Sequence, residues 1–259
     1  MTDKTRRKAF TLVELLVVIA IIGLLSTIAV ANMSSARQKA RIAAQQQSDT
    51  SYYHKLGAEI IADWSLDATT TSVSDTSGNG YDGTLAGTVT GSTYTSGVYG
   101  GGIYFDGSTN YIQPAKQITI YYNSFTASAW FKTNAAGGTP YILSGGEGVG
   151  HPIGLINGAL RFCTTATCTN GTKQFNDNDW HFAVVTGDGT SIRGYVDGAL
   201  QFTQAASASA ATASYAIGKD ANPSIYFYQG ALDQVRLYGL STTAQAVQKM
   251  YALGKISHQ

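Results

Sequence analysis

The stretch HFAVVTGDGTSIRGYVDG, residues 181–198, alternates apolar and polar side chains and contains two Asp-Gly pairs. Alternation with a period of two is the pattern of a strand that buries one face. Asp-Gly favours the tight turn of a β-hairpin, because glycine readily adopts the positive φ that such turns require. The stretch therefore predicts strands at His181–Thr186 and Ile192–Val196, with turns at Asp188-Gly189 and Asp197-Gly198.

The same pattern extends outward from this stretch, with turn signals about every 8 to 12 residues from Ile60 onward. A helical period appears only near the C-terminus, where we expect a closing helix over Thr242–Tyr251, ended by Gly254. Many short strands at this spacing predict a β-sandwich. The further predicted strands are Ile60–Leu66, Phe125–Lys132, Tyr141–Ser144, Ala159–Cys163 and Tyr226–Tyr238.

The overall composition limits the classes of function. The chain has 259 residues and a formal net charge of +1, and 13% of its residues are charged. This balance gives no sign of a basic surface for nucleic acid, so we expect no specific nucleic-acid binding. The 29 glycines and 16 tyrosines are typical of short strands joined by tight turns.

The N-terminal segment has a different composition. Residues 4–8, KTRRK, are basic, and Leu12–Ala31 is an almost unbroken aliphatic run. As a helix this run is roughly 30 Å long, enough to cross the hydrocarbon core of a membrane. The basic end is expected to stay in the cytoplasm, with the rest of the chain outside. Glu14 interrupts the run, which indicates either a functional carboxylate or a position near the lipid headgroups.

The segment Lys8–Leu25, KAFTLVELLVVIAIIGLL, resembles the cleavage and methylation segment of type IV prepilins. The resemblance implies that a prepilin peptidase cuts between Ala9 and Phe10 and methylates the new amino group of Phe10. It also implies that Glu14 sets the register of assembly. A buried carboxylate and a buried amine each need an opposite charge, so Glu14 can pair with the Phe10 amine of a neighbouring subunit. The family usually has glycine at the position of Ala9.

An ordinary secretory signal is the alternative interpretation of this segment. Ala29-Val-Ala31 fits the small-x-small cleavage site of such a signal, and removal there would release a soluble protein. The apolar run is longer than the usual stretch of about 7 to 15 residues, and it contains Glu14. The prepilin interpretation is therefore preferred.

A second resemblance covers about Ile61–Leu253 and is to the concanavalin A-like or laminin G-like (LamG) jelly rolls of bacterial surface proteins. It implies two antiparallel sheets in which the first and last strands are adjacent. The expected fold is mainly β: a long membrane-spanning pilin-type helix, then this sandwich, then a short C-terminal helix. The matching motifs are Trp64–Asp67, Asp75–Leu85, Gly101–Gly107, Phe125–Trp130, Trp180-His181, Asp188–Thr190, Tyr195–Gly198, Ala216–Gly218 and Phe227–Tyr238.

The two resemblances together define an expected domain organisation. Residues 1–9 are the leader peptide, 10–31 the transmembrane and assembly half of the pilin helix, and 32–59 its extracytoplasmic half with a linker. Residues 60–254 form the LamG-like sandwich, and 255–259 are a tail. The first proline is Pro114, so the helix can continue uninterrupted to about Lys55.

We expect no enzyme activity from this pattern. Glycan-cleaving members of the wider fold use an acid and a nucleophile about 5 to 5.5 Å apart, and no matching acidic triplet occurs on one strand. Glu147 and Asp179 stand alone on apparent loops. His181 is expected to be structural, and the other three histidines, His54, His151 and His258, to be solvated.

Aromatic residues are the candidates for ligand recognition. Trp64 and Trp130 occupy strand positions, where a core role is more common than a sugar platform. Exposed tyrosines on loops or on the concave sheet could instead stack on sugar rings, although nothing in the sequence picks out a glycan. The candidates are Tyr122, Tyr141, Tyr226 and Tyr228.

A structural calcium ion is the one cofactor that the sequence suggests. Asp75 and Asn79 place two oxygen-bearing side chains on a glycine-containing turn, and calcium prefers such ligands. The resemblance to LamG-like domains brings Asp67 and Asp233 near them. In the alternative interpretation, Asp75 and Asn79 hydrogen-bond only within their own loop.

The two cysteines, Cys163 and Cys168, are the only ones in the chain. Outside the membrane an even count suggests a disulfide, which would close a small loop and stabilise the fold modestly. Free thiols are the alternative in a reducing habitat.

The function expected from these features is that of a type IV pilus-like filament subunit, either a pilin or a minor pilin. Its outward LamG-like domain would serve adhesion or the recognition of a glycan or protein. The expected partners are the prepilin peptidase, other pilin subunits and the inner membrane before assembly. The alternatives are a pseudopilin of a type II secretion or DNA-uptake system, and a carbohydrate-binding surface protein anchored in the membrane. The expected location is the cytoplasmic membrane, then the cell surface after assembly.

Overall fold

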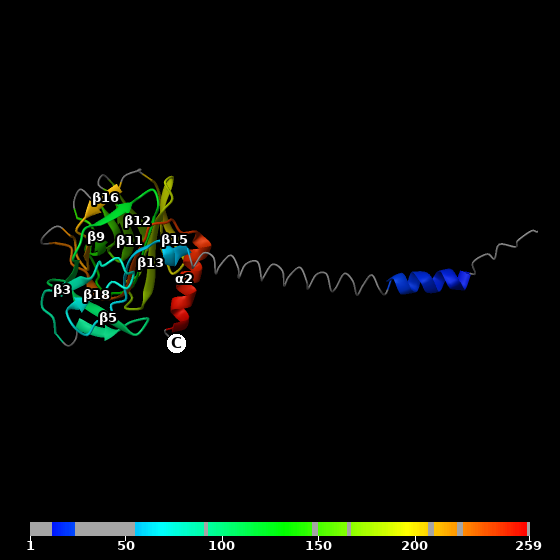
Figure 1. Cartoon of the computed structure of the whole chain (residues 1–259), viewed down its shortest axis with the longest axis horizontal. Coiled ribbons are helices and arrows are strands. Elements are labelled where there is room, and N and C mark those ends of the chain that lie inside the picture. The colour runs from blue at the N-terminus through cyan, green and yellow to red at the C-terminus, as the bar shows by residue number, and fades with distance from the viewer. Residues whose placement is uncertain are drawn as a thin grey trace, which may run out of the picture. The chain divides into compact units, whose positions relative to one another are not determined.

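The computed structural model describes residues 12–23, 55–90, 93–146, 150–164, 167–206, 210–221 and 225–257 (Figure 1). The chain divides into two compact units, Met1–Lys55 and Leu56–Gln259. The predicted cleavage site at Ala9 and Phe10 lies outside the described residues, as do residues 24–54 of the predicted helix.

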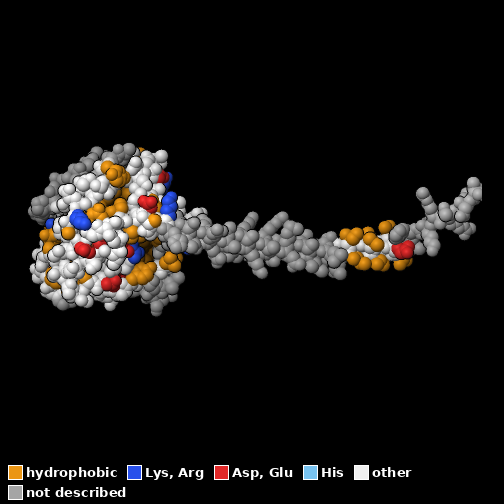
Figure 2. Space-filling view, in the orientation of Figure 1, with side chains coloured by type: hydrophobic (Ala, Val, Ile, Leu, Met, Phe, Trp, Pro, Cys, Tyr) orange, Lys and Arg blue, Asp and Glu red, His pale blue; other side chains and the backbone are white. Residues whose placement is uncertain are grey.

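The described part of the first unit is a helix over residues 12–23. Its aliphatic side chains are exposed, from 46% for Val18 to 79% for Leu12. Figure 2 shows hydrophobic side chains covering this helix, with an acidic group at one end. Within the described residues, no helix is both long and apolar enough for a membrane crossing. A helix that is apolar on all sides needs lipid or protein to cover it.

The second unit is a sandwich of two antiparallel sheets, which confirms the predicted fold class. In order, the first sheet contains β15 (Ala199–Ala205), β14 (Ser191–Val196), β13 (His181–Gly187), β8 (Phe125–Lys132), β18 (Gln229–Tyr238), β5 (Gly101–Asp106) and β4 (Tyr94–Ser96), with β1 (Ile60–Trp64) also paired to β18. The second sheet contains β12 (Cys168–Gln174), β11 (Ala159–Cys163), β10 (His151–Ile156), β9 (Tyr141–Ser144), β17 (Ala216–Ile217), β6 (Tyr111–Pro114), β3 (Gly83–Ala86) and β2 (Ser72–Val73). A separate pair joins β7 (Ile118–Tyr121) to β16 (Ala210–Ala213).

The longest strand, β18, organises the first sheet. Its first half pairs with β5 and its second half pairs with β1, while β8 runs along its other edge. The first and last strands of the sandwich are therefore adjacent, as the sequence predicted. The strands β8, β9 and β11 have the predicted bounds, whereas β18 begins at Gln229 rather than at Tyr226.

Both predicted Asp-Gly turns join neighbouring strands. Asp188-Gly189 lies between β13 and β14, and Asp197-Gly198 lies between β14 and β15. Asp197 and Gly198 both have positive φ, 54° and 77°, which is the conformation that a two-residue hairpin turn requires. This turn places the Asp197 carboxylate beside the start of β13.

The closing helix α2 (Ala244–Ser257) corrects one prediction. The sequence predicted that Gly254 ends the helix, but α2 continues through it. A Cβ at Gly254 would lie 2.1 Å from Cζ2 of Trp130, so glycine allows α2 to lie directly against the indole ring. Close packing, rather than helix termination, accounts for this glycine.

Candidate functional site

The first sheet is buried on both of its faces around β8 and β13. Phe125, Ala127, Ala129 and Phe131 of β8 point into the main core between the sheets. The intervening Trp130 points outward and joins a second apolar cluster. The outward members come from β8, β13, β14, α2 and the turn before β5: Val98, Trp130, Phe182, Val184, Tyr195 and Val247. The sheet alternation thus builds a platform on which α2 docks.

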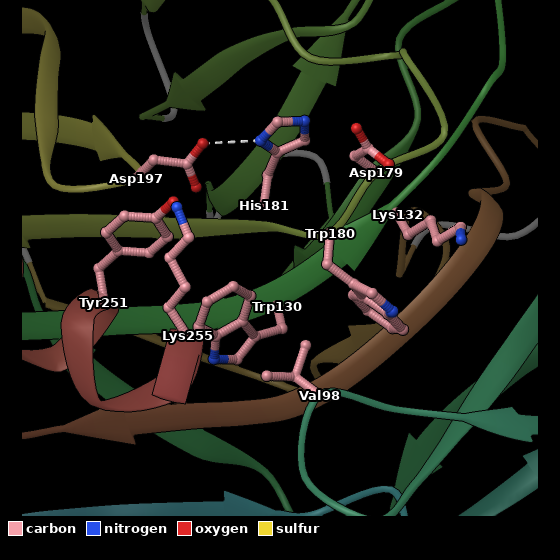
Figure 3. A pocket seen from close by; sticks show the side chains of 9 residues that line it. All are labelled: Val98, Trp130, Lys132, Asp179, Trp180, His181, Asp197, Tyr251 and Lys255. Atoms are coloured by element: carbon pink, nitrogen blue, oxygen red, sulfur yellow. Dashed lines mark hydrogen bonds and ion pairs between the residues drawn. The ribbon is translucent and has the colours of Figure 1, made fainter. Parts of the chain in front are cut away.

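A pocket of about 350 Å³ lies at the edge of this platform (Figure 3). Trp130 forms part of its wall, and its ring centroid is 5.8 Å from that of Tyr251 on α2. Figure 3 shows Trp180 and Tyr251 on opposite sides of the hollow, with His181 and Asp197 at one end. The lining residues are Val98, Trp130, Lys132, Asp179, Trp180, His181, Asp197, Tyr251 and Lys255.

His181 is held between two carboxylates. Its Nδ1 lies 2.7 Å from an oxygen of Asp197, and its Nε2 lies 2.9 Å from an oxygen of Asp177. Asp197 also accepts a hydrogen bond from the backbone N–H of Phe182. The Asp-Gly turn and the first residue of β13 are thereby fixed together. The sequence predicted a structural role for His181, and these contacts give the residue such a role at the rim of the pocket.

Burial alone would lower the pKa of His181, but hydrogen bonds and charges from Asp197 and Asp177 outweigh it and raise the pKa. The pKa of Asp177 is lowered, mainly by its hydrogen bond with His181. In the charged form both ring nitrogens donate, so imidazolium fits this pair better than neutral imidazole. The pocket therefore combines a fixed charged end with aromatic walls.

A second hollow, of about 150 Å³, shares Trp180 and Lys132 with the pocket. Its remaining lining comes from the β4–β5 hairpin, the segment after β8, the segment before β13, and β18. It consists of Thr95, Ser96, Tyr104, Thr133, Asn134, Asn178, Gly230 and Ala231. The two hollows therefore adjoin at this tryptophan. We call the pair the Trp180 groove.

The aromatic residues that the sequence singled out differ in how deeply they are buried. Trp64 and Trp130 are buried, which confirms their core assignment. Tyr122 and Tyr228 are fully buried and Tyr141 is nearly so, so the prediction that these rings could stack on sugars is wrong. These three side chains lie in the interior, at or next to the ends of strands, and each contacts another aromatic ring. Tyr226 is 44% exposed and lines a third hollow beside Pro140.

Sequence reasoning missed Trp180 as a ligand-contacting candidate. The signal was present, because Trp180 is the only tryptophan that precedes a predicted strand rather than lying within one. Residues at strand ends lie at the rim of a sandwich, where loops carry function. The prediction that His151 is solvated is wrong, whereas His54 and His258 lie outside the described residues.

Ser144, His151 and Asp220 meet on the second sheet, but their order differs from that of a catalytic triad. The Ser144 hydroxyl lies 2.6 Å from Nδ1 of His151 and 3.1 Å from a carboxylate oxygen of Asp220. In a triad the acid orients the histidine, whereas here the acid contacts the serine. Ser144 is also fully buried and accepts the backbone N–H of Gly146. The cluster therefore ties strand ends together.

The four predicted calcium ligands fall into two hydrogen-bonded groups. Asp75 accepts backbone N–H groups of Asp63, Ser77 and Tyr81 as well as the Ser77 hydroxyl. Burial alone would raise the pKa of Asp75, but these hydrogen bonds outweigh it and lower the pKa. The Asn79 amide donates to the carbonyls of Ile60 and Ile61. These hydrogen bonds of Asp75 and Asn79 tie their loop to β1.

Asp67 and Asp233 fit a cation better. Asp233 is fully buried and accepts from Val98 and Tyr99 through one oxygen, while its Oδ1 has no hydrogen-bond partner. Burial raises the pKa of Asp233 to about 7, and the negative charge of Asp67 adds to this effect. Calcium can coordinate a buried carboxylate oxygen that has no hydrogen-bond partner, together with a second carboxylate near it. Within the described residues, however, no group of three or more His, Cys, Asp or Glu could hold a metal.

Cys163 and Cys168 form a disulfide that joins directly paired positions of β11 and β12. It closes the turn at one edge of the second sheet.

The two packed antiparallel sheets define a jelly-roll domain. A family model described as the concanavalin A-like lectin/glucanases superfamily matches residues 106–248, more than half of the chain. The chain belongs to this superfamily. The prokaryotic N-terminal methylation motif matches residues 4–30, so the same chain begins with a prepilin-type segment.

Solved structures show the same fold. Domain 4 of AbnA, a GH43 extracellular arabinanase from Geobacillus stearothermophilus in complex with arabinotriose, is 20% identical with a TM-score of 0.61, covering 74% of this chain and 98% of that domain. The binding domain of Paraclostridial Mosquitocidal Protein 1 is 16% identical with a TM-score of 0.60, covering 76% of this chain and 52% of that one. The botulinum neurotoxin serotype D binding domain is 13% identical with a TM-score of 0.54, at coverages of 76% and 52%. No curated protein matches the sequence.

Proposed function

We propose that this protein is a type IV pilus-like filament subunit whose jelly-roll domain binds a glycan and thereby mediates adhesion. The observation that carries the proposal is that one chain joins a prepilin motif to a concanavalin A-like domain. The exposed aliphatic helix requires a hydrophobic partner, and packing in a filament supplies one. The Trp180 groove supplies the recognition surface. One of the structural neighbours is bound to arabinotriose, and this supports carbohydrate as the ligand class.

The proposed action is recognition without catalysis. The groove combines aromatic rings with a few polar side chains, which is the composition of a site that orients a ligand. At its charged end, His181 is bound to Asp197 and to the neighbouring Asp177, rather than aimed with them at a common reacting atom. The prepilin peptidase acts on the N-terminal segment before assembly.

Filament assembly is tested by electron microscopy of cells that produce the wild type or Glu14→Ala. We expect surface filaments containing the wild-type protein and loss of the variant from them, because the register pair with the Phe10 amine is removed. Glu14→Gln retains the shape without the charge and is expected to fail as well. Full incorporation of both variants would contradict the assembly role. Wild-type protein that stays in the membrane without filaments would favour the anchored surface protein.

The glycan-binding part is tested separately on a glycan array with the full chain in a detergent that has no sugar headgroup. We expect binding by the wild type and loss of binding by Trp180→Ala. An array on which the wild type binds no glycan would contradict recognition of carbohydrate, whatever the result for filaments.

The proposal includes a calcium ion held by Asp67 and Asp233 in a structural role. Its binding would neutralise two carboxylates and satisfy Oδ1 of Asp233. We expect the melting temperature to rise with calcium and to fall again with EDTA, and Asp67→Asn to abolish this response. An unchanged melting temperature in the wild type would contradict the site.

A further inference from the structure

The Trp180 groove has two hollows of different chemistry. The larger, which we call the charged subsite, contains His181, Asp197, Asp179 and Lys255. The smaller, which we call the neutral subsite, is lined by hydroxyl and amide side chains and by Tyr104, and its single charged group is Lys132. Trp180 and Lys132 belong to both. A ligand that fills both subsites would therefore contact Trp180 in each.

Trp180 is positioned to support such a ligand. It is half-buried and packs against the apolar cluster beneath α2, so its base is fixed while part of its ring remains accessible. Figure 3 shows its indole directed away from Tyr251. An anchored aromatic ring binds a ligand at low cost in conformational entropy, because few torsions remain to be fixed.

The neutral subsite limits what the ligand can be. Thr95, Ser96, Asn134 and Asn178 are exposed and carry groups that both donate and accept hydrogen bonds. Such groups match sugar hydroxyls, and Tyr104, which is 39% exposed, offers an apolar ring beside them. The hydroxyl and amide side chains of this lining outnumber its single ammonium group, and they suit the uncharged hydroxyls of a neutral sugar.

We propose that the groove binds the interior of a neutral polysaccharide chain, with consecutive sugar residues in the two subsites that adjoin at Trp180. This inference rests on the proposed glycan recognition and deepens it, because it specifies the ligand as an uncharged chain rather than a single terminal sugar. The charged subsite holds one sugar against Tyr251 and Asp179. The neutral subsite holds the next sugar against Tyr104.

The test uses the full chain in the same sugar-free detergent and isothermal titration calorimetry. The probes are size-graded series, from one to six sugars, of cello-, xylo-, arabino-, manno-, malto- and chito-oligosaccharides. For the series that binds, we expect the affinity to rise at least tenfold between one sugar and three, then to level off. Trp180→Ala should abolish binding of every length, and Trp180→Phe should retain part of it.

Tyr104→Ala separates the two subsites. We expect this variant to bind long oligomers no more tightly than the wild type binds a single sugar. Tyr121→Ala is the matched control, because Tyr121 is 57% exposed on β7 and lines neither hollow. It should bind like the wild type.

Three results would overturn the inference. Affinity that does not depend on chain length, together with loss of binding in Trp180→Ala, would show a single-sugar site and leave the proposed function intact. If the wild type bound acidic glycans on the array and none of the neutral series, the assignment to a neutral chain would be wrong. The proposed glycan recognition would still stand. A wild type that binds no glycan of either kind would overturn this inference and the proposed glycan recognition together.

Discussion

Trp130 and Trp180 line the same pocket, yet they belong to different parts of the structure. Trp130 lies within β8 and is 4% exposed, enclosed by Phe182, Tyr251 and Gly254. Trp180 lies just before β13 and remains half-buried. The same side chain thus supports the fold at one position and offers a surface at the other. The position along the strand, rather than the residue type, decides which role it has.

The substitution Trp130→Ala should have the largest effect on stability. It removes the centre of the second apolar cluster and leaves a cavity beneath α2, so we expect the free energy of unfolding to fall by about 4 kcal/mol. Chemical denaturation of the full chain, followed by fluorescence and circular dichroism, measures this change. A loss below about 1 kcal/mol would show that the cluster collapses around the cavity and that Trp130 is not its centre.

Gly254→Ala tests the same packing from the side of the helix. In an exposed helix alanine would stabilise by about 1 kcal/mol relative to glycine. Here the new Cβ would lie 2.1 Å from the Trp130 ring, so α2 must move outward. We expect a net loss of about 2 kcal/mol, in the range for overpacking. The matched control is Ala252→Gly at an exposed position of α2, where the loss should be about 1 kcal/mol from propensity alone. A stabilised Gly254→Ala variant would contradict the close approach.

The sandwich could be predicted from local pattern because its signals are local. Period-two alternation predicted strands such as β8, and the Asp-Gly pair predicted the hairpin turn at Asp197. Neither prediction required knowing which strand is the neighbour in the sheet. The position of α2 could not be predicted this way. It depends on the fit of Gly254 against Trp130, which are more than one hundred residues apart, and sequence alone suggested only a helix end.

The candidate site was predictable in part. The pattern placed Trp130 in the core, and the motif Trp180-His181 was visible, but the groove draws its other residues from distant elements. Tyr251 and Lys255 come from α2, whereas Lys132 comes from the end of β8. At the predicted calcium ligands, backbone N–H groups of β1 and of the loop donate to Asp75, and the Asn79 amide donates to backbone carbonyls of β1. The sequence suggested hydrogen bonds within the loop as the alternative, but it does not identify the partners on β1.

The pair of carboxylates around His181 makes stability depend on pH. The pKa of His181 is raised in the folded state, so its contribution is fully present below the unfolded value of about 6.5 and is lost as pH rises through the folded pKa. We expect the melting temperature of the wild type to fall as pH rises through this window. The fall should be smaller than the one caused by Trp130→Ala or by Gly254→Ala. Asp197→Asn removes one partner charge and should flatten the dependence. Histidine resonances followed by NMR during a pH titration would identify the group, and a pKa for His181 below its ordinary value would contradict the assignment.

Trp180→Ala should have the smallest effect on stability and completes the comparison. Its ring is partly in water and lies at a loop position, so we expect the free energy of unfolding to change by about 0.5 kcal/mol, as for other surface substitutions. Denaturation of this variant beside Trp130→Ala measures the contrast directly. If the two losses were equal, Trp180 would be a second structural anchor, and any loss of glycan binding in the variant would follow from damage to the fold. If the fold stays intact while binding is lost, the exposed part of Trp180 belongs to the recognition surface, because nothing else in the domain has changed.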